Sequence, residues 1–160
     1  MPCTVIVGGF FGDEGKGKIV GYLAMKDKAD IAVRGGVGPN AGHTVMFNGK
    51  EYKTRMLPSA LVSDQTRLMI GPGVLVNVDV LLKKIKNFST NDRTFVDPQC
   101  GIIDSTHIDK DTSDPNLTRI GTTGTGTGPA NADRALRKAH LARDSTELSE
   151  YLQDISNTVN

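Results

Sequence analysis

The strongest constraint on the fold is a glycine-rich stretch, Gly8 to Lys18, which follows a short β-branched apolar run and precedes an apolar helical stripe. The run Thr4 to Val7 is typical of a strand buried on both faces, and the apolar positions of Lys18 to Met25 lie on one face of a helix. A second strand is predicted over Ala29 to Val33. A strand, a tight turn, a helix and a second strand form the repeating unit of parallel sheets. We therefore expect an α/β fold of the P-loop type, with a mostly parallel sheet flanked by helices.

The segment that follows breaks this simple alternation. Asn48-Gly49 separates two strand-like runs, 44–47 and 52–57, and Asn-Gly is the strongest short-range signal for a two-residue hairpin turn. We expect a β-hairpin inserted after the second strand. The remaining predicted elements are strands at 67–70, 94–96 and 101–104, a helix at 78–88 capped by Asn77, a polar surface loop at 107–116, a helix at 131–143 capped by Asn131, and a last helix from Asp144 to about Asn157.

Length and charge exclude several classes of protein. A chain of 160 residues suffices for one domain with its own core. Its 19 basic and 18 acidic residues leave no broad positive field for nucleic acid. No apolar run approaches the roughly 20 residues that a membrane span requires. Cys3 and Cys100 lie far apart without metal-ligand spacing, which indicates a reducing compartment. We expect a cytoplasmic protein that binds neither nucleic acid nor a membrane.

The segment Gly12 to Lys18 has the GxxxxGK spacing of a phosphate-binding loop, although Ile19 stands where a Ser or Thr is expected. Glycines let successive backbone N–H groups turn towards a phosphate, the helix N-terminus adds partial positive charge, and lysines add full charges. The missing hydroxyl normally helps to hold Mg²⁺, and the carboxylate of Asp13 is a suitable replacement as an oxygen ligand. The alternative is a glycine-rich turn with solvated charges.

A second polar loop, Gly35 to Thr44, follows the second predicted strand and contains Asn40 and His43. Taken alone, His43 is an ordinary loop histidine, and we expect His107 and His140 to be surface residues as well. Beside a phosphate loop that carries a carboxylate, however, an imidazole is a suitable proton donor to a departing phosphate oxygen.

Three stretches together resemble the adenylosuccinate synthetase family: GDEGKGK at 12–18, NAGHT at 40–44 and IGTTGTGTGPANADR at 120–134. They occur in the order of that family, and the wording GGVGPNAGHT is similar to its shorter, archaeal-type members. The resemblance implies a GTP-dependent ligase of AMP biosynthesis. Such an enzyme joins IMP and L-aspartate into adenylosuccinate through 6-phosphoryl-IMP, with Mg²⁺ as the cofactor.

The resemblance also implies roles for individual residues. Asp13 would be the general base on N1 of IMP and a Mg²⁺ ligand together with the carbonyl of Gly42, and His43 would be the acid. Retention of Asp13 favours IMP, because viral relatives that act on a guanine nucleotide tend to replace it. The implied GTP site comprises Gly12, Asp13, Glu14, Gly15, Lys16, Gly17, Lys18, Gly42, His43 and Thr44. The implied IMP site comprises Asp13, Glu14, Gly15, Lys16, Asn40, Ala41, Gly42, His43, Thr123 and Arg137.

Arg137 matches the family arginine that reaches the IMP phosphate of a neighbouring subunit, which implies a homodimer with shared sites. The chain also departs from the family. Phe10-Phe11 stand where Gln-Trp is common, and Thr125 stands where a basic or other residue is usual. Full family members are more than twice this long. We therefore expect residues 1–160 to form the N-terminal, nucleotide-binding part of such a domain, which should not complete the reaction alone.

Two other functions remain open on the residues alone. One is a truncated, non-catalytic relative that binds purine nucleotides. The other is a generic P-loop NTPase that uses Asp13 and His43 for hydrolysis. The missing hydroxyl at position 19, and the lack of a clear second metal-binding Asp after a strand, argue against the NTPase.

Overall fold

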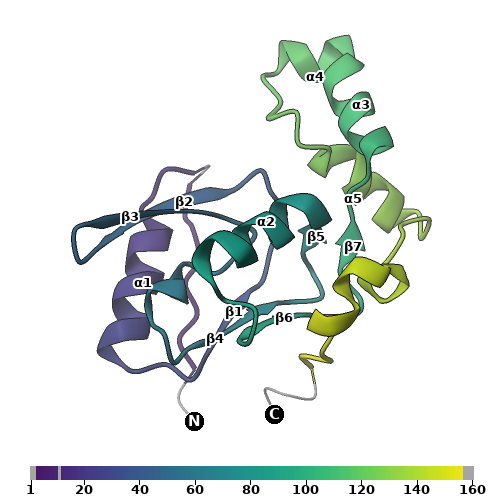
Figure 1. Cartoon of the computed structure of the whole chain (residues 1–160). Coiled ribbons are helices and arrows are strands. Elements are labelled where there is room, and N and C mark those ends of the chain that lie inside the picture. Colours follow the sequence, from purple (N-terminus) through teal and green to yellow (C-terminus); the bar gives the residue numbers. More distant parts are fainter. Residues whose placement is uncertain (1–2, 11, 157–160) are drawn as a thin grey trace.

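The computed structural model describes residues 3–10 and 12–156, and its centre is a parallel sheet of three strands (Figure 1). Strand β4 (Arg67–Ile70) lies between β1 (Ile31–Arg34) and β6 (Thr94–Val96). Leu68, Met69 and Ile70 are all completely buried, as expected for the middle strand of a parallel sheet covered on both faces. The predicted α/β class with a mostly parallel sheet is confirmed.

The helix α2 (Val78–Phe88) covers one face of this sheet. The side chain of Asn77 caps it by accepting a hydrogen bond from the N–H of Val80, at 3.0 Å. Leu81 and Ile85 are buried one turn apart, in the main hydrophobic core. The predicted bounds of this helix, and of β4 and β6, agree with the structure.

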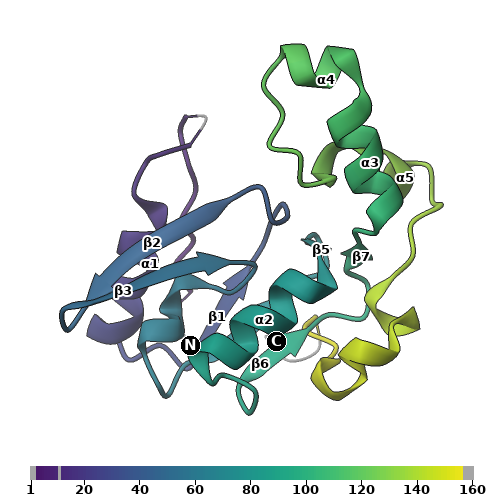
Figure 2. The same cartoon turned by 45° about the horizontal axis from the view of Figure 1, so that its top comes forward.

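The predicted hairpin is present as β2 (Gly42–Phe47) paired with β3 (Lys50–Arg55). Asn48 and Gly49 form its turn with φ values of 47° and 75°. Two successive positive φ angles define the hairpin turn that matches strand twist, and Asn-Gly adopts them at little cost. The hairpin lies between β1 and β4 in the sequence, packs beside α1 (Lys16–Lys26) and contributes to the same core as the parallel sheet (Figure 2).

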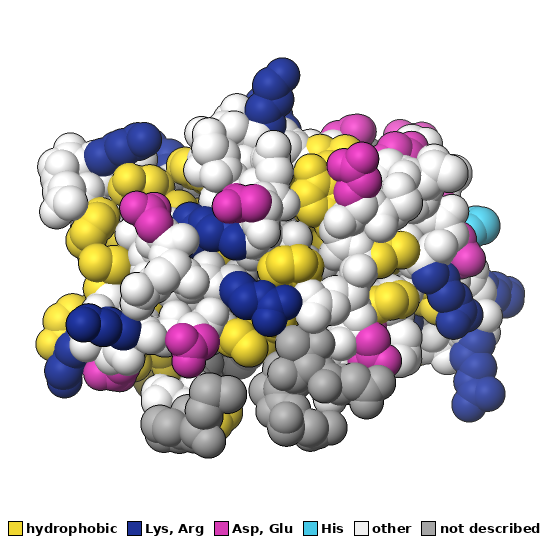
Figure 3. Space-filling model, turned by 60° about the horizontal axis from the view of Figure 1, so that its bottom comes forward, with side chains coloured by type: hydrophobic (Ala, Val, Ile, Leu, Met, Phe, Trp, Pro, Cys, Tyr) yellow, Lys and Arg dark blue, Asp and Glu magenta, His cyan; other side chains and the backbone are white. Residues whose placement is uncertain are grey.

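The helix α1 is pressed closely against its neighbours. Its buried positions Gly17, Gly21 and Ala24 face β2 and the short 3₁₀ helix η1 (Ser59–Val62). Small residues on that side let the backbones approach, while the outward positions Ile19, Tyr22 and Met25 are 49%, 59% and 39% exposed. Figure 3 shows hydrophobic side chains exposed among charged ones on one face, several of them along its left edge.

A second lobe projects from the sheet and contains α3 (Ser105–Ser113), α4 (Pro115–Arg119) and α5 (Thr127–Ala135) (Figures 1 and 2). Two short parallel strands, β5 (Leu75–Val76) and β7 (Gly101–Ile102), connect it to the rest of the chain. The chain then returns through two 3₁₀ helices, η2 (Ala142–Asp144) and η3 (Thr146–Tyr151), which lie near β6.

The predicted strand Thr4 to Val7 is wrong for this structure. The segment is extended but belongs to no strand, and Val5 and Val7 are 77% and 79% exposed. An apolar run predicts burial, but a strand also requires a neighbour for its backbone N–H and C=O groups, and no described strand pairs with this segment.

The predicted loop 107–116 is also wrong, because it forms α3 and α4. The carboxylate of Asp104 accepts the N–H of His107 at 3.1 Å, and the His107 ring returns the contact to the N–H of Asp104. This reciprocal cap starts a helix that has no apolar stripe to announce it. Asp114 caps the next helix, with Pro115 in its first turn.

Two predicted helices have the wrong bounds or type. The helix expected at 131–143 begins at Thr127, because Gly126 with φ 73° is its cap, and it ends at Ala135. The last predicted α-helix, from Asp144 to about Asn157, is instead the shorter 3₁₀ helix η3, and Asn157 lies outside the described residues. Within the part of the chain that is described, no helix has the length and apolar character to cross a membrane.

Candidate nucleotide site

The loop before α1 turns through three residues of left-handed backbone: Gly12, Asp13 and Gly15, with φ of 122°, 52° and 73°. Gly15 is the cap of α1, and no side chain caps the first turn of that helix. The first N–H groups of a helix lack intrahelical partners and attract anions. The loop therefore presents backbone donors where a phosphate-binding loop should present them.

Asp13 is exposed, and its carboxylate makes no hydrogen bond or ion pair with any described residue. A positive φ at a residue with a Cβ costs free energy, and such strain gathers at functional sites. The loop thus holds a free carboxylate next to the start of a helix. This position suits either proton transfer or binding of a cation.

Glu14 closes the loop upon itself. Its carboxylate accepts the N–H of Phe10 at 2.7 Å and also binds the ammonium group of Lys16. These contacts hold the pKa of Glu14 below its usual range, chiefly through Lys16 and then through the Phe10 N–H. Phe10 itself is 84% exposed, and Phe11 lies outside the described residues. Glu14 and Lys16 form part of the loop's internal scaffold.

His43 on β2 lies directly against the start of α1. A Cβ added to Gly17 would lie 2.6 Å from the Cβ of His43 and 3.0 Å from the hydroxyl of Ser59, so only glycine fits there. The pKa of His43 is lowered, mainly by burial and further by the positive charges of Arg34 and Lys16. The structure therefore brings two of the predicted motifs together, in surroundings that favour the neutral form of the imidazole.

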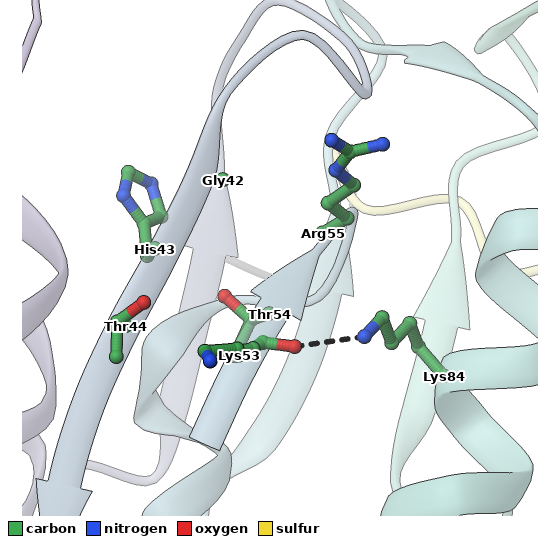
Figure 4. Close-up of a pocket in the computed structure, with 7 residues that line it drawn as sticks. All are labelled: Gly42, His43, Thr44, Lys53, Thr54, Arg55 and Lys84. Atoms are coloured by element: carbon green, nitrogen blue, oxygen red, sulfur yellow. Dashed lines mark hydrogen bonds between the residues drawn. The ribbon is translucent and has the colours of Figure 1, made fainter. Parts of the chain in front are cut away.

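A cavity of about 330 Å³ opens along the hairpin beside His43 (Figure 4). Three of its lining side chains, Lys53, Arg55 and Lys84, are cationic, and none of its seven described lining residues is acidic. Lys84 reaches from α2 and donates to the carbonyl of Lys53 at 2.9 Å. Such a lining suits an anionic ligand. The remaining lining residues are Gly42, His43, Thr44 and Thr54.

Arg34 is a functional candidate that the sequence analysis missed. It is 8% exposed at the end of β1, and its guanidinium donates to the carbonyls of Gly38 and Ala41 at 2.8 and 3.1 Å. Burial lowers its pKa to about 10. The two bonds pin the loop that presents Asn40, which is exposed. The signal in the sequence was a basic residue directly after the predicted strand at 29–33.

The remaining predicted site residues lie elsewhere. Thr123 and Arg137 are exposed on the second lobe, on either side of α5, and not at the loop before α1. The hydroxyl of Thr123 lies 2.9 Å from that of Thr125, and Arg137 has a φ of 59°. His107, predicted at the surface, is only 3% exposed, because its ring caps α3 and also contacts Asp133 at 3.2 Å. His140 is exposed as predicted.

The donor chemistry of the loop fits magnesium. Among residues 3–10 and 12–156, no group of three or more His, Cys, Asp or Glu side chains is placed to enclose a metal ion. Mg²⁺, however, commonly uses one or two protein oxygens and takes its other ligands from water and substrate phosphates. A free carboxylate at Asp13 and a carbonyl at Gly42 are compatible with that mode of binding.

Comparison with known proteins settles the family. The family model described as adenylosuccinate synthetase matches residues 5–160. The chain belongs to the adenylosuccinate synthetase family. It is 49% identical to the adenylosuccinate synthetase of Methanococcus aeolicus, and 52% identical to those of Methanocaldococcus jannaschii and Archaeoglobus fulgidus. Each match covers 100% of this chain but only 48–49% of the relative, so the chain spans about half the length of these adenylosuccinate synthetases.

Solved structures of adenylosuccinate synthetase-like proteins have the same fold. The fully ligated adenylosuccinate synthetase from Plasmodium falciparum matches with a TM-score of 0.75 and 30% identity, over 82% of this chain and 32% of that one. A succinoaminodeoxyadenylate synthetase of cyanophage S-2L, bound to dGMP and dATP, matches with a TM-score of 0.69 and 24% identity, over 89% and 42%. The second likeness concerns the fold alone.

Proposed function

We propose that this chain supplies the GTP- and IMP-binding part of an adenylosuccinate synthetase, a magnesium-dependent ligase of AMP biosynthesis. The observation that carries the proposal is the contact of His43 with Gly17, which joins the NAGHT motif to the phosphate loop. Family membership supplies the reaction: IMP and L-aspartate are joined at the expense of GTP.

Asp13 and His43 divide the chemistry of the first step. Asp13, free and exposed in the loop, takes the proton from N1 of IMP, and the 6-oxygen then attacks the γ-phosphorus of GTP. The bond to the β–γ bridging oxygen breaks, and His43 donates a hydrogen bond to that departing oxygen. Its lowered pKa favours the neutral imidazole, which still carries one N–H donor. The amino group of aspartate then displaces the phosphate of 6-phosphoryl-IMP.

The loop before α1 and the start of the hairpin supply the GTP site: residues 12–18 with Gly42, His43 and Thr44. A bound Mg²⁺, held by the carboxylate of Asp13 and the carbonyl of Gly42, would neutralise charge on the phosphates. Asn40 and Ala41 face IMP from the loop that Arg34 pins. Thr123 and, from a second copy of the chain, Arg137 complete the IMP site, so the active form is a homodimer. We place this homodimer in the cytoplasm.

The reaction also requires the polypeptide that corresponds to the other half of the relatives. Two observations support this requirement: the chain covers only 48–49% of the similar proteins named above, and the outward side of α1 exposes Ile19 and Tyr22. A helix that is apolar on both sides is normally buried on both sides. We expect no turnover of GTP, IMP and aspartate by this chain alone.

Thermal unfolding of the purified chain with Mg²⁺ tests the proposal. GTP and IMP together should raise the Tm by more than the sum of their separate effects, because the two ligands share the loop. Stabilisation by GTP alone, with none from IMP, would instead indicate a generic NTPase. No response to either nucleotide would refute nucleotide binding, and full turnover by the chain alone would refute the need for the other half.

A further inference from the structure

The carboxylate of Asp111 lies beneath the glycine–threonine loop of the second lobe, which we define as residues 121–127. Asp111 is on α3 and only 3% exposed. One of its oxygens accepts the hydroxyl of Thr122 at 2.6 Å, and the other accepts the backbone N–H of Gly126 at 2.8 Å. Both oxygens of a buried carboxylate are thus used on a single loop.

The loop has almost no freedom to shift at its second attachment. Gly126 has a φ of 73°, and a Cβ there would lie 2.9 Å from the backbone nitrogen of Ile108 and 3.0 Å from the carbonyl carbon of His107. Thr122, the first attachment, also accepts the N–H of Gly124 at 3.2 Å. Positions 122, 124 and 126 are therefore tied, directly or through one hydroxyl, to Asp111.

The threonines at the alternate positions of the loop contact one another. The hydroxyls of Thr123, Thr125 and Thr127 form a chain with successive separations of 2.9 Å, and Thr123 at its outer end is exposed. In this row of hydroxyls Thr127 is buried, Thr125 is partly exposed and Thr123 is exposed. The hydroxyl of Thr125 thereby supports that of Thr123.

We propose that Asp111 is a positioning residue for IMP: it fixes the backbone of the glycine–threonine loop so that Thr123 meets the nucleotide in one orientation. This inference rests on the proposed function, since it assumes that Thr123 contacts IMP. Asp111 does not touch the nucleotide itself. Because Asp111 already holds the loop in place before IMP binds, little conformational entropy of the loop is lost on binding, and the affinity for IMP is higher.

A separate contact allows this role to be distinguished from a purely structural one. The Nε2 atom of His107 lies 3.2 Å from a carboxylate oxygen of Asp133 and links α3 to α5. Ile108 of α3 packs against the apolar cluster that includes Ala130 of α5 and adds a second contact between the two helices. Removal of the Asp111 carboxylate should therefore release the loop while α3 stays packed on α5.

The experiment compares three variants of the full chain by titration with IMP and, separately, with GTP. Asp111→Ala should weaken IMP binding about tenfold, because the released loop must then be ordered when IMP binds, and it should leave GTP binding unchanged. Asp111→Asn should restore IMP binding, because its amide oxygen accepts from Gly126 while its NH₂ donates to Thr122. Asp109→Ala, an exposed acid on the same helix, is the matched control and should change neither affinity.

Amide hydrogen exchange supplies the second readout. The amides of Gly124 and Gly126 should exchange faster in Asp111→Ala and not in Asp111→Asn, with the amides of α5 unaffected. Normal IMP binding by Asp111→Ala would overturn the role of Asp111 while leaving the proposed function in place. Equal loss of IMP and GTP binding, or failure of Asp111→Asn to restore IMP binding, would also overturn it. Absence of IMP binding by the unaltered chain would instead refute the proposed function itself.

Discussion

The helices α1 and α2 each have eleven residues, but they differ in the side chains that they expose. Only α2 buries its apolar side and exposes a polar one. Helix α2 buries Leu81 and Ile85 and turns lysines such as Lys83 to solvent. Helix α1 buries small residues and turns Ile19 and Tyr22 outward. The difference shows which surfaces are complete within this chain: the α2 side is an ordinary solvent face, and the α1 side is not.

A similar contrast holds between strand β4 and the N-terminal segment 4–7, which was predicted to be a strand. Leu68 in β4 is completely buried between two strands, whereas Val7 lies in an extended segment and is 79% exposed. Some apolar segments are therefore buried in the core, and others are exposed. Substitutions in the two kinds of segment should differ in their effect on the free energy of unfolding.

The largest effect on the free energy of unfolding is expected in the buried core around β4. Leu68→Ala should lower the free energy of unfolding by about 3 kcal/mol, because it leaves a cavity at a site without exposure. Val7→Ala should change it by less than about 0.5 kcal/mol. Urea unfolding of both variants measures the contrast. A loss of similar size at Val7 would mean that the N-terminal segment is as well packed as the sheet.

A smaller effect is expected where α1 meets the hairpin. Gly17→Ala should destabilise the chain by about 1–3 kcal/mol, since the added methyl group meets His43 and must push β2 from α1. It should also abolish stabilisation by GTP. Gly128→Ala in α5, where nothing lies within 4 Å, is the matched control and should be neutral or slightly stabilising. The two melting curves, with and without GTP, give the answer.

His43 should contribute to the loss of stability that the chain shows as the pH falls. Because its pKa is lower in the folded chain than the ordinary value of 6.5, the unfolded chain binds the proton more readily. Its effect on stability is therefore favourable above about pH 6.5 and is lost as the pH falls below that value. His43→Gln should lose less stability than the unaltered chain between pH 7.5 and 5.5. The exposed His140→Gln should behave as the unaltered chain does.

The smallest effect on stability is expected on the outward side of α1. Tyr22→Ser should change the free energy of unfolding by less than about 0.5 kcal/mol, as should Lys83→Ser on α2. Only Tyr22→Ser should weaken binding to a separately prepared polypeptide that corresponds to the other half of a relative. Equal binding by both variants, measured by titration, would show that the outward side of α1 is not used.

Local signals were enough to predict most of the sheet and its hairpin. Asn77 marks the start of α2, and Asn48-Gly49 fixes the turn, because each acts through contacts within a few residues. The helix α3 was missed because its start depends on a reciprocal contact of Asp104 with His107, in a stretch without hydrophobic periodicity. The false strand at 4–7 shows the opposite error, since an apolar run does not supply its own partner strand.

The candidate site could be predicted only where its residues belong to motifs. The phosphate loop and His43 were found in this way, and the structure brings them together through Gly17. Lys84 and Arg34 were missed because their relation to the site arises from tertiary packing: one reaches across from α2, and the other folds back on its own loop. Asp111 was missed as well, since nothing local ties it to Gly126, 15 positions away.

The two lobes have separate hydrophobic clusters. One surrounds the parallel sheet, and the other consists of Leu75, Ile103 and Ala130. The loop before α1 leads into a helix that packs on the first cluster, and the glycine–threonine loop leads into α5, which packs on the second. Replacement of a residue in one hydrophobic cluster therefore need not change the packing of the other cluster. A substitution in either cluster should therefore act mainly on the loop of its own lobe.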